Sequence, residues 1–435
     1  MYALCRSLRE TNCAEWNTSE WKVTNINSMF DSCYRLRKLD LSHWDTSNWT
    51  VTSINYAWSC CFSLEYLDVS TWNTKKWHPS SLDYTFYNCI SLKELDLSNW
   101  DTSIWTITTM RSAWAYMYCL RKLDISTWDT SNWAVVNMQS VWNGCYSLIE
   151  LPIGNWDVSN WTVNYLSYAW SACYSLQNLP IGNWNVSNWR PSSLESTWGS
   201  CYMLRELPIE NWNVSDWVVT SLSGTWGSLH NLQSLNLNKW DVSNWRVTTC
   251  YAMFYACWSL KELKIDQWDV SDWPVTDFSR VFYYCYNLEE IDLTSWNVSN
   301  WAVTTVYYLF NSMWYAKKID IHNWDVSNWS LTEARYLYGS NYTTTLLLPT
   351  NLYGTVTNSK YTANLSNLVN FHGPSLDINQ NYSNSRRLTH ESLVTLINEL
   401  PTVSDTKTLT LGQTNRLKLT AAEIAVATQK GWTVA

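Results

Sequence analysis

The chain has 435 residues and a formal net charge of −8, from 29 basic and 37 acidic residues scattered along the sequence. Scattered basic residues argue against a nucleic-acid partner, which needs clustered Lys and Arg, and no apolar run of about 20 residues is long enough to span a membrane. Trp and Tyr are abundant, at 33 and 27, but Gly is rare, at 11, so we expect Asn and Asp to close the turns by entering the left-handed region.

The N-terminus, MYALCRSLRE, does not resemble a secretory signal. Tyr2, Cys5 and Leu8 already fit the repeat described below, so the chain starts in the middle of a repeat. A first coil without a cap exposes an unpaired edge. We therefore expect a second copy of the chain, or an upstream module, to be able to extend it.

Two tryptophan series recur every 28 residues without a gap, one from Trp16 to Trp324 and the other from Trp21 to Trp329. A fixed period in the range of 20 to 50 residues is typical of solenoids and propellers. Burying one aromatic side chain removes roughly 150 to 250 Å² from water. We therefore assign both series to the core rather than to a binding site.

Each copy begins with an LxxLxLxxW segment. In the copy around residue 40, Leu39 and Leu41 alternate with the polar Asp40 and Ser42, which is the pattern of a half-buried strand. The following WDTSNW carries Asp or Asn and then Ser, residues that close a turn by bonding to nearby backbone groups and that could also bond from copy to copy. A calcium ladder is the alternative for these recurrent carboxylates, although Asn replaces Asp in five copies.

The second half of each copy, VTSINYAWSCCFSL, places apolar residues three or four positions apart. That spacing predicts a short helix. The predicted fold is an α/β solenoid of about twelve leucine-rich-repeat-like units over residues 1–340, each with one parallel strand and one short helix.

Nine of the thirteen cysteines keep the 28-residue period, and Met117, Leu229 and Met313 take the same position in other copies. Exchange with Met and Leu indicates a buried apolar position filled by free thiols. Disulfides or a metal site remain the alternative. Four cysteines lie outside this series and form no CxxC pair: Cys13, Cys60, Cys119 and Cys250.

The pattern decays near the C-terminus. We read residues 341–386, which are rich in Asn, Ser, Thr and Tyr, as a degenerate repeat followed by an irregular connection. Residues 387–435 predict a helix–strand–helix cap. Its second helix should open with a capping box from Thr420 to Glu423 and end at Gly431.

The unit FDSCYRLRKLDLSHWDTSNWTVTSI resembles the BspA-like leucine-rich repeats of bacterial surface proteins, from residue 1 to about 338. Here each copy is longer, with Trp49 following Asn48, and Pro152, Pro180 and Pro208 replace the outward Asp in the middle copies. The C-terminal block is similar to the end of such proteins in Gram-positive gut bacteria and in phage tail proteins. The resemblance implies a location outside the cell, on the cell surface or on a virion.

Two sets of residues are candidates for ligand binding. An aromatic position follows the cysteine series, where rings could stack on sugars: Tyr34, Phe62, Tyr118, Tyr146, Tyr174, Tyr202, Trp258 and Tyr286. One outward strand position varies from copy to copy, as in Lys38, Tyr66 and Glu94. One outward position further along the strand lie Asp40, Asp68, Asp96 and Asp124. Both sets also fit an ordinary surface, with rings covering the core and solvated charges.

We therefore expect a non-enzymatic recognition protein without a cofactor, binding a cell-surface glycan or protein as a bacterial adhesin or a phage tail component. A self-assembling structural protein is the alternative from another class. An enzyme acting on polysaccharides is a third, but the six histidines hold unrelated repeat positions and suggest no catalytic triad.

Overall fold

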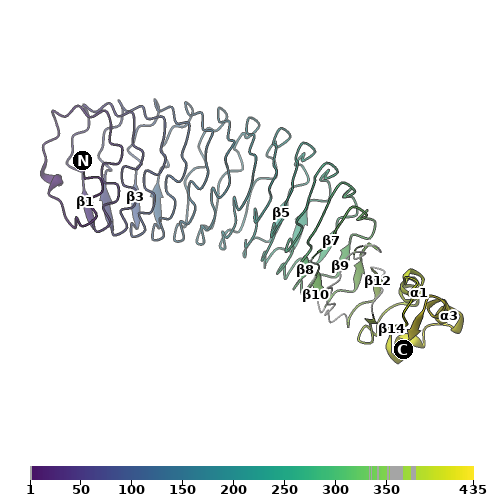
Figure 1. Ribbon diagram of the computed structural model, residues 1–435. Coiled ribbons are helices and arrows are strands. Elements are labelled where there is room, and N and C mark those ends of the chain that lie inside the picture. Colours follow the sequence, from purple (N-terminus) through teal and green to yellow (C-terminus); the bar gives the residue numbers. More distant parts are fainter. Residues whose placement is uncertain are drawn as a thin grey trace. The chain divides into compact units, whose positions relative to one another are not determined.

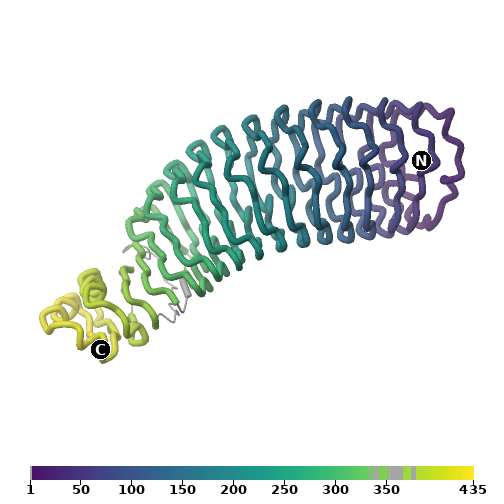
Figure 2. The backbone as a smooth tube through the Cα atoms, turned by 180° about the vertical axis from the view of Figure 1, so that it is seen from behind, coloured from purple at the N-terminus to yellow at the C-terminus, as the bar shows by residue number. Residues whose placement is uncertain are grey.

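The computed structural model describes residues 2–332, 334, 336–339, 342–349, 352, 366–373 and 379–435. The chain divides into two compact units, residues 1–232 and 233–435. Within the first unit, and in the second up to β11, each copy of the repeat forms one coil, and consecutive coils stack in parallel (Figures 1 and 2). The predicted leucine-rich-repeat-like solenoid is confirmed.

In the first unit a short 3-10 helix, η1 (Cys13–Glu15), precedes the strands β1 (Lys38–Asp40), β2 (Tyr66–Asp68), β3 (Glu94–Asp96) and β4 (Lys122–Asp124). β1 pairs with β2, and β3 with β4, in parallel. Each residue lies beside the equivalent residue of the next copy, as Lys38 does beside Tyr66. The middle residue of each strand is buried and its neighbours face outward. The strand predicted for each copy is therefore present in these four copies.

The three copies that carry Pro152, Pro180 and Pro208 have no strand at this position. Proline lacks the N–H group that a ladder needs. Instead, the Ile153 N–H donates to the carbonyl oxygen of Leu151 at 2.9 Å within the same copy, and Ile181 and Leu179 do the same. The prolines thus interrupt the regular strand surface in these three copies.

The short helix predicted for the second half of each copy is wrong. That half consists of consecutive turns: Ala57 N–H donates to Ile54 O at 3.2 Å within the copy, but Trp58 N–H donates to Thr85 O of the next copy at 2.9 Å. Successive tight turns place apolar residues three or four positions apart, just as a helix does. The N–H groups that a helix would use internally join neighbouring coils instead.

These turns also explain how the chain manages with few glycines, and here the expectation for Asn and Asp fails. The left-handed residues are not in WDTSNW but in the turn half, where Tyr56 and Cys60 both have φ of 57°. A left-handed L-residue costs roughly 1 to 2 kcal/mol. The bond of Cys60 N–H to Tyr87 O of the next copy, at 2.7 Å, helps to offset this cost.

The WDTSNW corners close by side-chain hydrogen bonds, as predicted. Asp45 Oδ1 accepts from Ser47 N–H at 2.9 Å, and Asn185 plays the same part towards Ser187. The predicted bonding from copy to copy is also present, because Asn48 Nδ2 donates to the carbonyl oxygen of Ser19 at 2.9 Å.

The two tryptophan series form the core. Trp44 stacks on Trp72 with ring centroids 6.1 Å apart and planes 6° apart, and Trp72 Nε1 donates to Leu41 O at 3.1 Å. Trp49, from the second series, packs against Trp72 with ring centroids 5.7 Å apart and planes tilted by 58°. All three side chains are at most 2% exposed, so their assignment to structure rather than to a site is confirmed.

The cysteine series is a ladder of free, mostly buried thiols, as predicted. Burial raises the pKa of the Cys33 thiol to about 11 and raises the pKa values of Cys61 and Cys89 as well. These groups therefore stay protonated and pack as small apolar side chains.

The second unit also contains coils, with strands of two or three residues. They are β5 (Ser234–Asn236), β6 (Glu262–Lys264), β7 (Glu290–Asp292), β8 (Phe310–Asn311), β9 (Lys318–Asp320), β10 (Tyr338–Gly339), β11 (Thr345–Leu347) and β12 (Asn370–His372). One sheet has the order β12-β11-β9-β7, all parallel. Parts of the connection predicted for residues 341–386 lie outside the described residues, and β11 and β12 show that other parts of it pair with the sheet.

After β12 the chain forms a small helical and stranded end. A parallel sheet has the order β13 (Gln380–Asn381), β14 (Lys407–Thr410) and β15 (Trp432–Val434), accompanied by the helices α1 (His390–Glu399), α2 (Gly412–Arg416) and α3 (Ala421–Gln429). α3 opens with the capping box of Thr420 and Glu423. Gly431 follows it with φ of 88°.

Candidate functional site

The strand surface of the first unit brings the variable outward residues into rows. Register pairing sets Lys38 beside Tyr66, and Glu94 beside Lys122. All four are exposed, and Tyr66 is 44% exposed although it is a large aromatic residue. The buried residue between each pair of outward positions is always Leu in these copies. The strands therefore present side chains of changing charge and size on a constant core.

The predicted aspartate row has a structural task. Asp40, Asp68, Asp96 and Asp124 each use Oδ1 to accept two bonds from the serine two residues later, and the bond to the serine hydroxyl is 2.7 Å in every case. These bonds close the turn after the strand. The second carboxylate oxygen still faces the strand surface: Asp68 Oδ2 accepts from the Tyr66 hydroxyl at 3.1 Å.

Burial by itself would raise the pKa of Asp68, but the hydrogen bonds from Ser70 and Tyr66 outweigh it, so the pKa lies below its usual value. The main role of the aspartates at this position is to close the turn through Oδ1. Only the other carboxylate oxygen, Oδ2, can contact a ligand.

The predicted aromatic row is a column of rings stacked on one another. In the first unit Tyr34 stacks on Phe62 at 4.7 Å. After Ile90 the column continues through the pairs Tyr118–Tyr146 and Tyr146–Tyr174 at 4.4 Å, Tyr174–Tyr202 at 4.5 Å and Tyr202–His230 at 4.3 Å. In the second unit Tyr286 lies between Trp258 and Trp314, at 6.2 and 4.3 Å.

Stacking closes the surfaces that a sugar would need. Each ring inside the column has a neighbouring ring on both faces, so only its edge is open. The hydroxyl groups also interact along the column: burial first, and then the neighbouring tyrosines, raise the pKa values of Tyr118, Tyr146 and Tyr174. The column covers this side of the coils. Its inner rings offer only their edges, so the stacking of sugars that we expected stays a prediction for the rings at the ends of the column.

Among the described residues, hollows lie along the strands, and three of them have no lining residue from the aromatic row. The largest, of about 770 Å³, lies at β1 in the first unit. The second, of about 420 Å³, lies at β7 in the second unit. The third, of about 370 Å³, lies where β4 meets the first proline copy and includes Asp124 and Pro152. These three hollows thus lie at the strands and not at the ring column.

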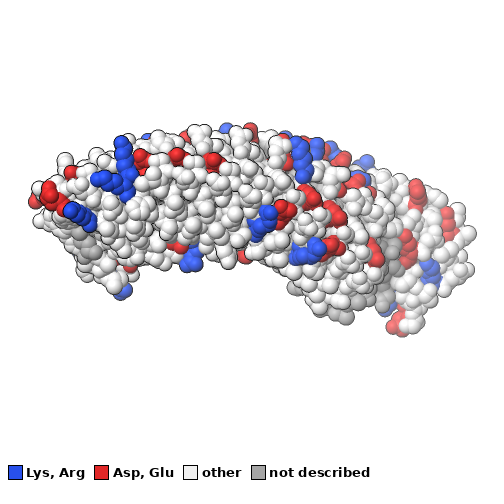
Figure 3. Space-filling model, turned by 90° about the horizontal axis from the view of Figure 1, so that it is seen from above, with Lys and Arg blue, Asp and Glu red and all other residues white. Residues whose placement is uncertain are grey.

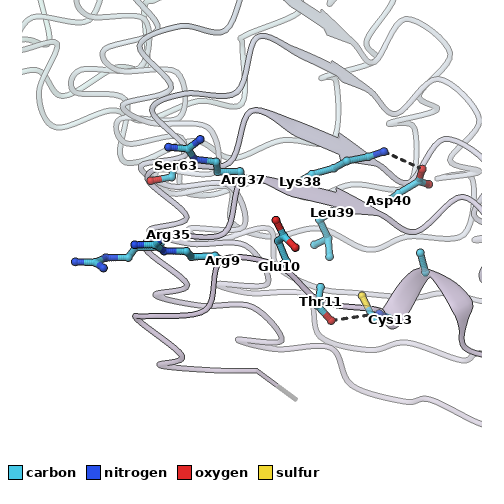
Figure 4. Close-up of a pocket in the computed structure, with 11 residues that line it drawn as sticks. Arg9, Glu10, Thr11, Cys13, Arg35, Arg37, Lys38, Leu39, Asp40 and Ser63 are labelled. Carbon is cyan, nitrogen blue, oxygen red and sulfur yellow. Dashed lines mark hydrogen bonds and ion pairs between the residues drawn. The ribbon is translucent and has the colours of Figure 1, made fainter.

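We call the hollow at β1 the N-terminal hollow. Its charged lining consists of the basic residues Arg9, Arg35, Arg37 and Lys38 and the acidic residues Glu10 and Asp40 (Figure 4). Lys38 and Asp40 were among the predicted site residues, and their charged groups lie 3.9 Å apart. The three arginines were missed. Arg9 and Arg37 lie 28 residues apart at one repeat position, and that spacing could have revealed their proximity.

Charges elsewhere are sparse and mixed in sign. Figure 3 shows a face on which most atoms belong to uncharged residues, with Lys or Arg often near Asp or Glu. Ion pairs join consecutive copies, such as Arg190 with Asp216 at 2.7 Å and Lys318 with Asp292 at 2.8 Å. Such a surface favours contacts with a ligand that also carries both signs of charge.

The histidine contacts are structural. His372 of β12 uses both ring nitrogens, one with Leu348 O and one with Glu399 of α1, each at 2.7 Å. His322 Nδ1 lies 2.6 Å from Asp320. Among the described residues, no group of three or more His, Cys, Asp and Glu could hold a metal ion, and no described helix is long and apolar enough to cross a membrane.

Comparison with known proteins gives one family. A family model described as "Mycoplasma protein of unknown function, DUF285" matches four overlapping stretches, residues 1–104, 80–194, 181–272 and 248–346. No curated protein matches the chain.

Similar solved structures have low identity. A leucine-rich-repeat protein of Leptospira interrogans is 12% identical, covering 89% of this chain and 95% of that chain with a TM-score of 0.26. The functional domain of InlJ from Listeria monocytogenes, which includes a cysteine ladder, is 14% identical, with coverages of 87% and 70% and a TM-score of 0.22. The Arabidopsis receptor kinase HAESA, in complex with the peptide hormone IDA and the co-receptor SERK1, is 12% identical, with coverages of 92% and 80% and a TM-score of 0.25.

Proposed function

We propose that this chain, which belongs to the DUF285 family of Mycoplasma proteins of unknown function, is a non-enzymatic recognition protein that binds a protein ligand on its exposed strands. The observation that carries the proposal is the row of outward strand residues. Between Lys38 and Lys122 these residues change from copy to copy while the buried residue beside them stays Leu. A surface that varies on a constant core is how repeat proteins present a recognition site.

A protein ligand fits this surface better than a glycan. Sugars bind aromatic residues through open ring faces, and the ring column leaves its inner members only their edges. The strands offer instead basic and acidic groups, the partly exposed Tyr66 and nearby hollows. Tyrosine and arginine are enriched in protein interfaces, and the rim of such an interface is polar.

A location outside the cell, on a bacterial surface or on a phage tail, belongs to the same proposal. It rests on the resemblance of the repeat to BspA-like surface proteins, which covers residues 1 to about 338. On a bacterial surface the protein would be an adhesin, and on a phage tail it would bind the host receptor.

Site-specific cross-linking tests the proposal. In two variants, a photo-activated cross-linking residue replaces Tyr66 or Glu94 on the strands. In the control variant, the same residue replaces Asn132, which is exposed at a corner. Each protein is incubated with intact bacterial cells, with protease-shaved cells and with periodate-oxidised cells. We expect cross-links from positions 66 and 94 only, lost after protease treatment and retained after periodate. Equal cross-linking at position 132 would contradict the strand surface, and loss after periodate alone would indicate a glycan.

A further inference from the structure

Three arginines gather on one side of the N-terminal hollow. Arg9 and Arg37 hold the same position in consecutive coils, and Arg37 N–H donates to the carbonyl oxygen of Arg9 at 3.5 Å. Arg35 is two residues from Arg37 and lines the same hollow, together with Ser63. Figure 4 shows the three arginine side chains on one side, the pair of Lys38 and Asp40 on the other, and Glu10 between them.

Within the described part of the chain, no ion pair involves Arg9, Arg35 or Arg37, whereas Arg190 and Arg246 each pair with an aspartate of the next copy, at 2.7 and 3.1 Å. Like charges placed side by side on neighbouring strands destabilise a fold. We therefore expect an anion that binds between these arginines to stabilise the fold.

We propose that this arginine cluster binds a carboxylate group of the protein ligand. The planar guanidinium fork matches a carboxylate with two parallel hydrogen bonds, which gives direction as well as attraction. The hollow of about 770 Å³ has room for an acidic side chain and its neighbours. The site rests on the proposed function, because it lies at the N-terminal end of the same strand surface.

The extent of the cluster favours one acidic group over an anionic polymer. The column of Arg9 and Arg37 continues with Glu65, whose N–H donates to Arg37 O at 2.8 Å. Glu10 and Asp40 also line the hollow. A chain of phosphates or uronic acids would meet these carboxylates as soon as it passed the arginines, and the whole chain carries a net charge of −8.

Thermal shift with short peptides tests the site at constant ionic strength. The probe is a capped peptide with two adjacent glutamates, and the same peptide with two glutamines is its control. We expect the glutamate peptide alone to raise the Tm saturably, and Arg37→Gln to weaken that binding at least 10-fold. Arg205→Gln is the matched control. Arg205 has the same repeat position as Arg37, but the residue at that position in the preceding coil is the uncharged Gln177. Binding that Arg37→Gln leaves intact would overturn the proposal, as would tighter binding of polyphosphate than of the peptide.

A second readout needs no ligand. Because the cluster is repulsive, Arg9→Gln and Arg37→Gln should each raise the Tm of the free protein by on the order of 1 to 2 °C, whereas Arg205→Gln should not. A fall in Tm would contradict the argument.

The two proposals fail separately. If cross-linking from position 66 survives in Arg37→Gln, the strand surface stands and the carboxylate site fails. If position 66 never cross-links but the glutamate peptide binds through Arg37, the carboxylate site stands and the protein-recognition proposal fails.

Discussion

The Cys61 thiol donates a hydrogen bond of 3.1 Å to the carbonyl oxygen of Phe30, 31 residues earlier in the chain. The same bond joins Cys89 to Trp58 and Cys145 to Trp114. The carbonyl oxygen of Phe30 also accepts from the Cys33 N–H at 3.2 Å, so the thiol adds a second, weak donor in the volume of a small apolar side chain. The thiols therefore connect consecutive coils without any disulfide.

Replacing one ladder thiol should destabilise the solenoid. In Cys145→Ala the carbonyl oxygen of Trp114 loses its donor, worth about 0.5 to 1.5 kcal/mol, and the lost sulfur adds a small cavity. We expect a loss of about 1 to 3 kcal/mol in urea denaturation. Cys119 is exposed, so Cys119→Ser should change stability by less than about 0.5 kcal/mol. An unchanged midpoint for Cys145→Ala would show that the thiol bond contributes little.

The ladder should make the protein sensitive to alkali. Burial raises the folded pKa values of Cys33, Cys61 and Cys89, while unfolded thiols titrate near pH 8.5. Their stabilisation is fully present below that pH and is lost as the pH rises through the folded pKa, about 11 for Cys33. The urea midpoint should fall between pH 8 and 10, and less so in Cys89→Met, which copies the residue at position 117. A midpoint constant over this range would contradict the ladder pKa values.

The corner aspartates should make the protein lose stability in acid, whereas the cysteine ladder makes it lose stability in alkali. Ser103 donates to Asp101 through its hydroxyl and its N–H, and these bonds lower the pKa of the carboxyl group. The stabilisation is present above the unfolded pKa, near 3.9, and is lost as the pH falls through the folded value. Asp101→Asn keeps both bonds, as Asn185 does with Ser187, but cannot titrate. Its Tm should fall less than that of the wild type between pH 5 and 2.5.

Substitutions of a ring in the column and of a ring on the strands should have different effects, the first on stability and the second on ligand binding. Tyr146 lies between Tyr118 and Tyr174, at 4.4 Å from each, so Tyr146→Leu should cost about 1 to 3 kcal/mol and leave cell binding unchanged. Tyr66 is exposed, so Tyr66→Ala should reduce cell binding at least 5-fold with a small change in Tm. Cell binding is measured by flow cytometry of the labelled variants. If Tyr146→Leu abolished binding in a folded protein, the column would itself be part of the site.

Much of the fold was predictable because the repeat carries the same information twelve times. The alternation of Leu39, Asp40 and Leu41 identifies a strand and its buried side, and the exchange of Cys145 for Met117 identifies an apolar position. The turn half was misread, because its apolar spacing suits both a helix and a series of tight turns. Whether the Trp58 N–H bonds within its own copy or to Thr85 of the next one depends on the neighbouring coil.

The sequence by itself determined the period, the inward residues and the rows of outward ones, since all three follow from repetition and side-chain polarity. Only the tertiary structure decided what those rows can do. Stacking of consecutive coils closed the faces of Tyr146 and Tyr174, and it brought Arg35 and Ser63 into one hollow although they belong to different copies. The physical reason is that both results depend on distances across the stack, which the order of residues along one copy does not specify.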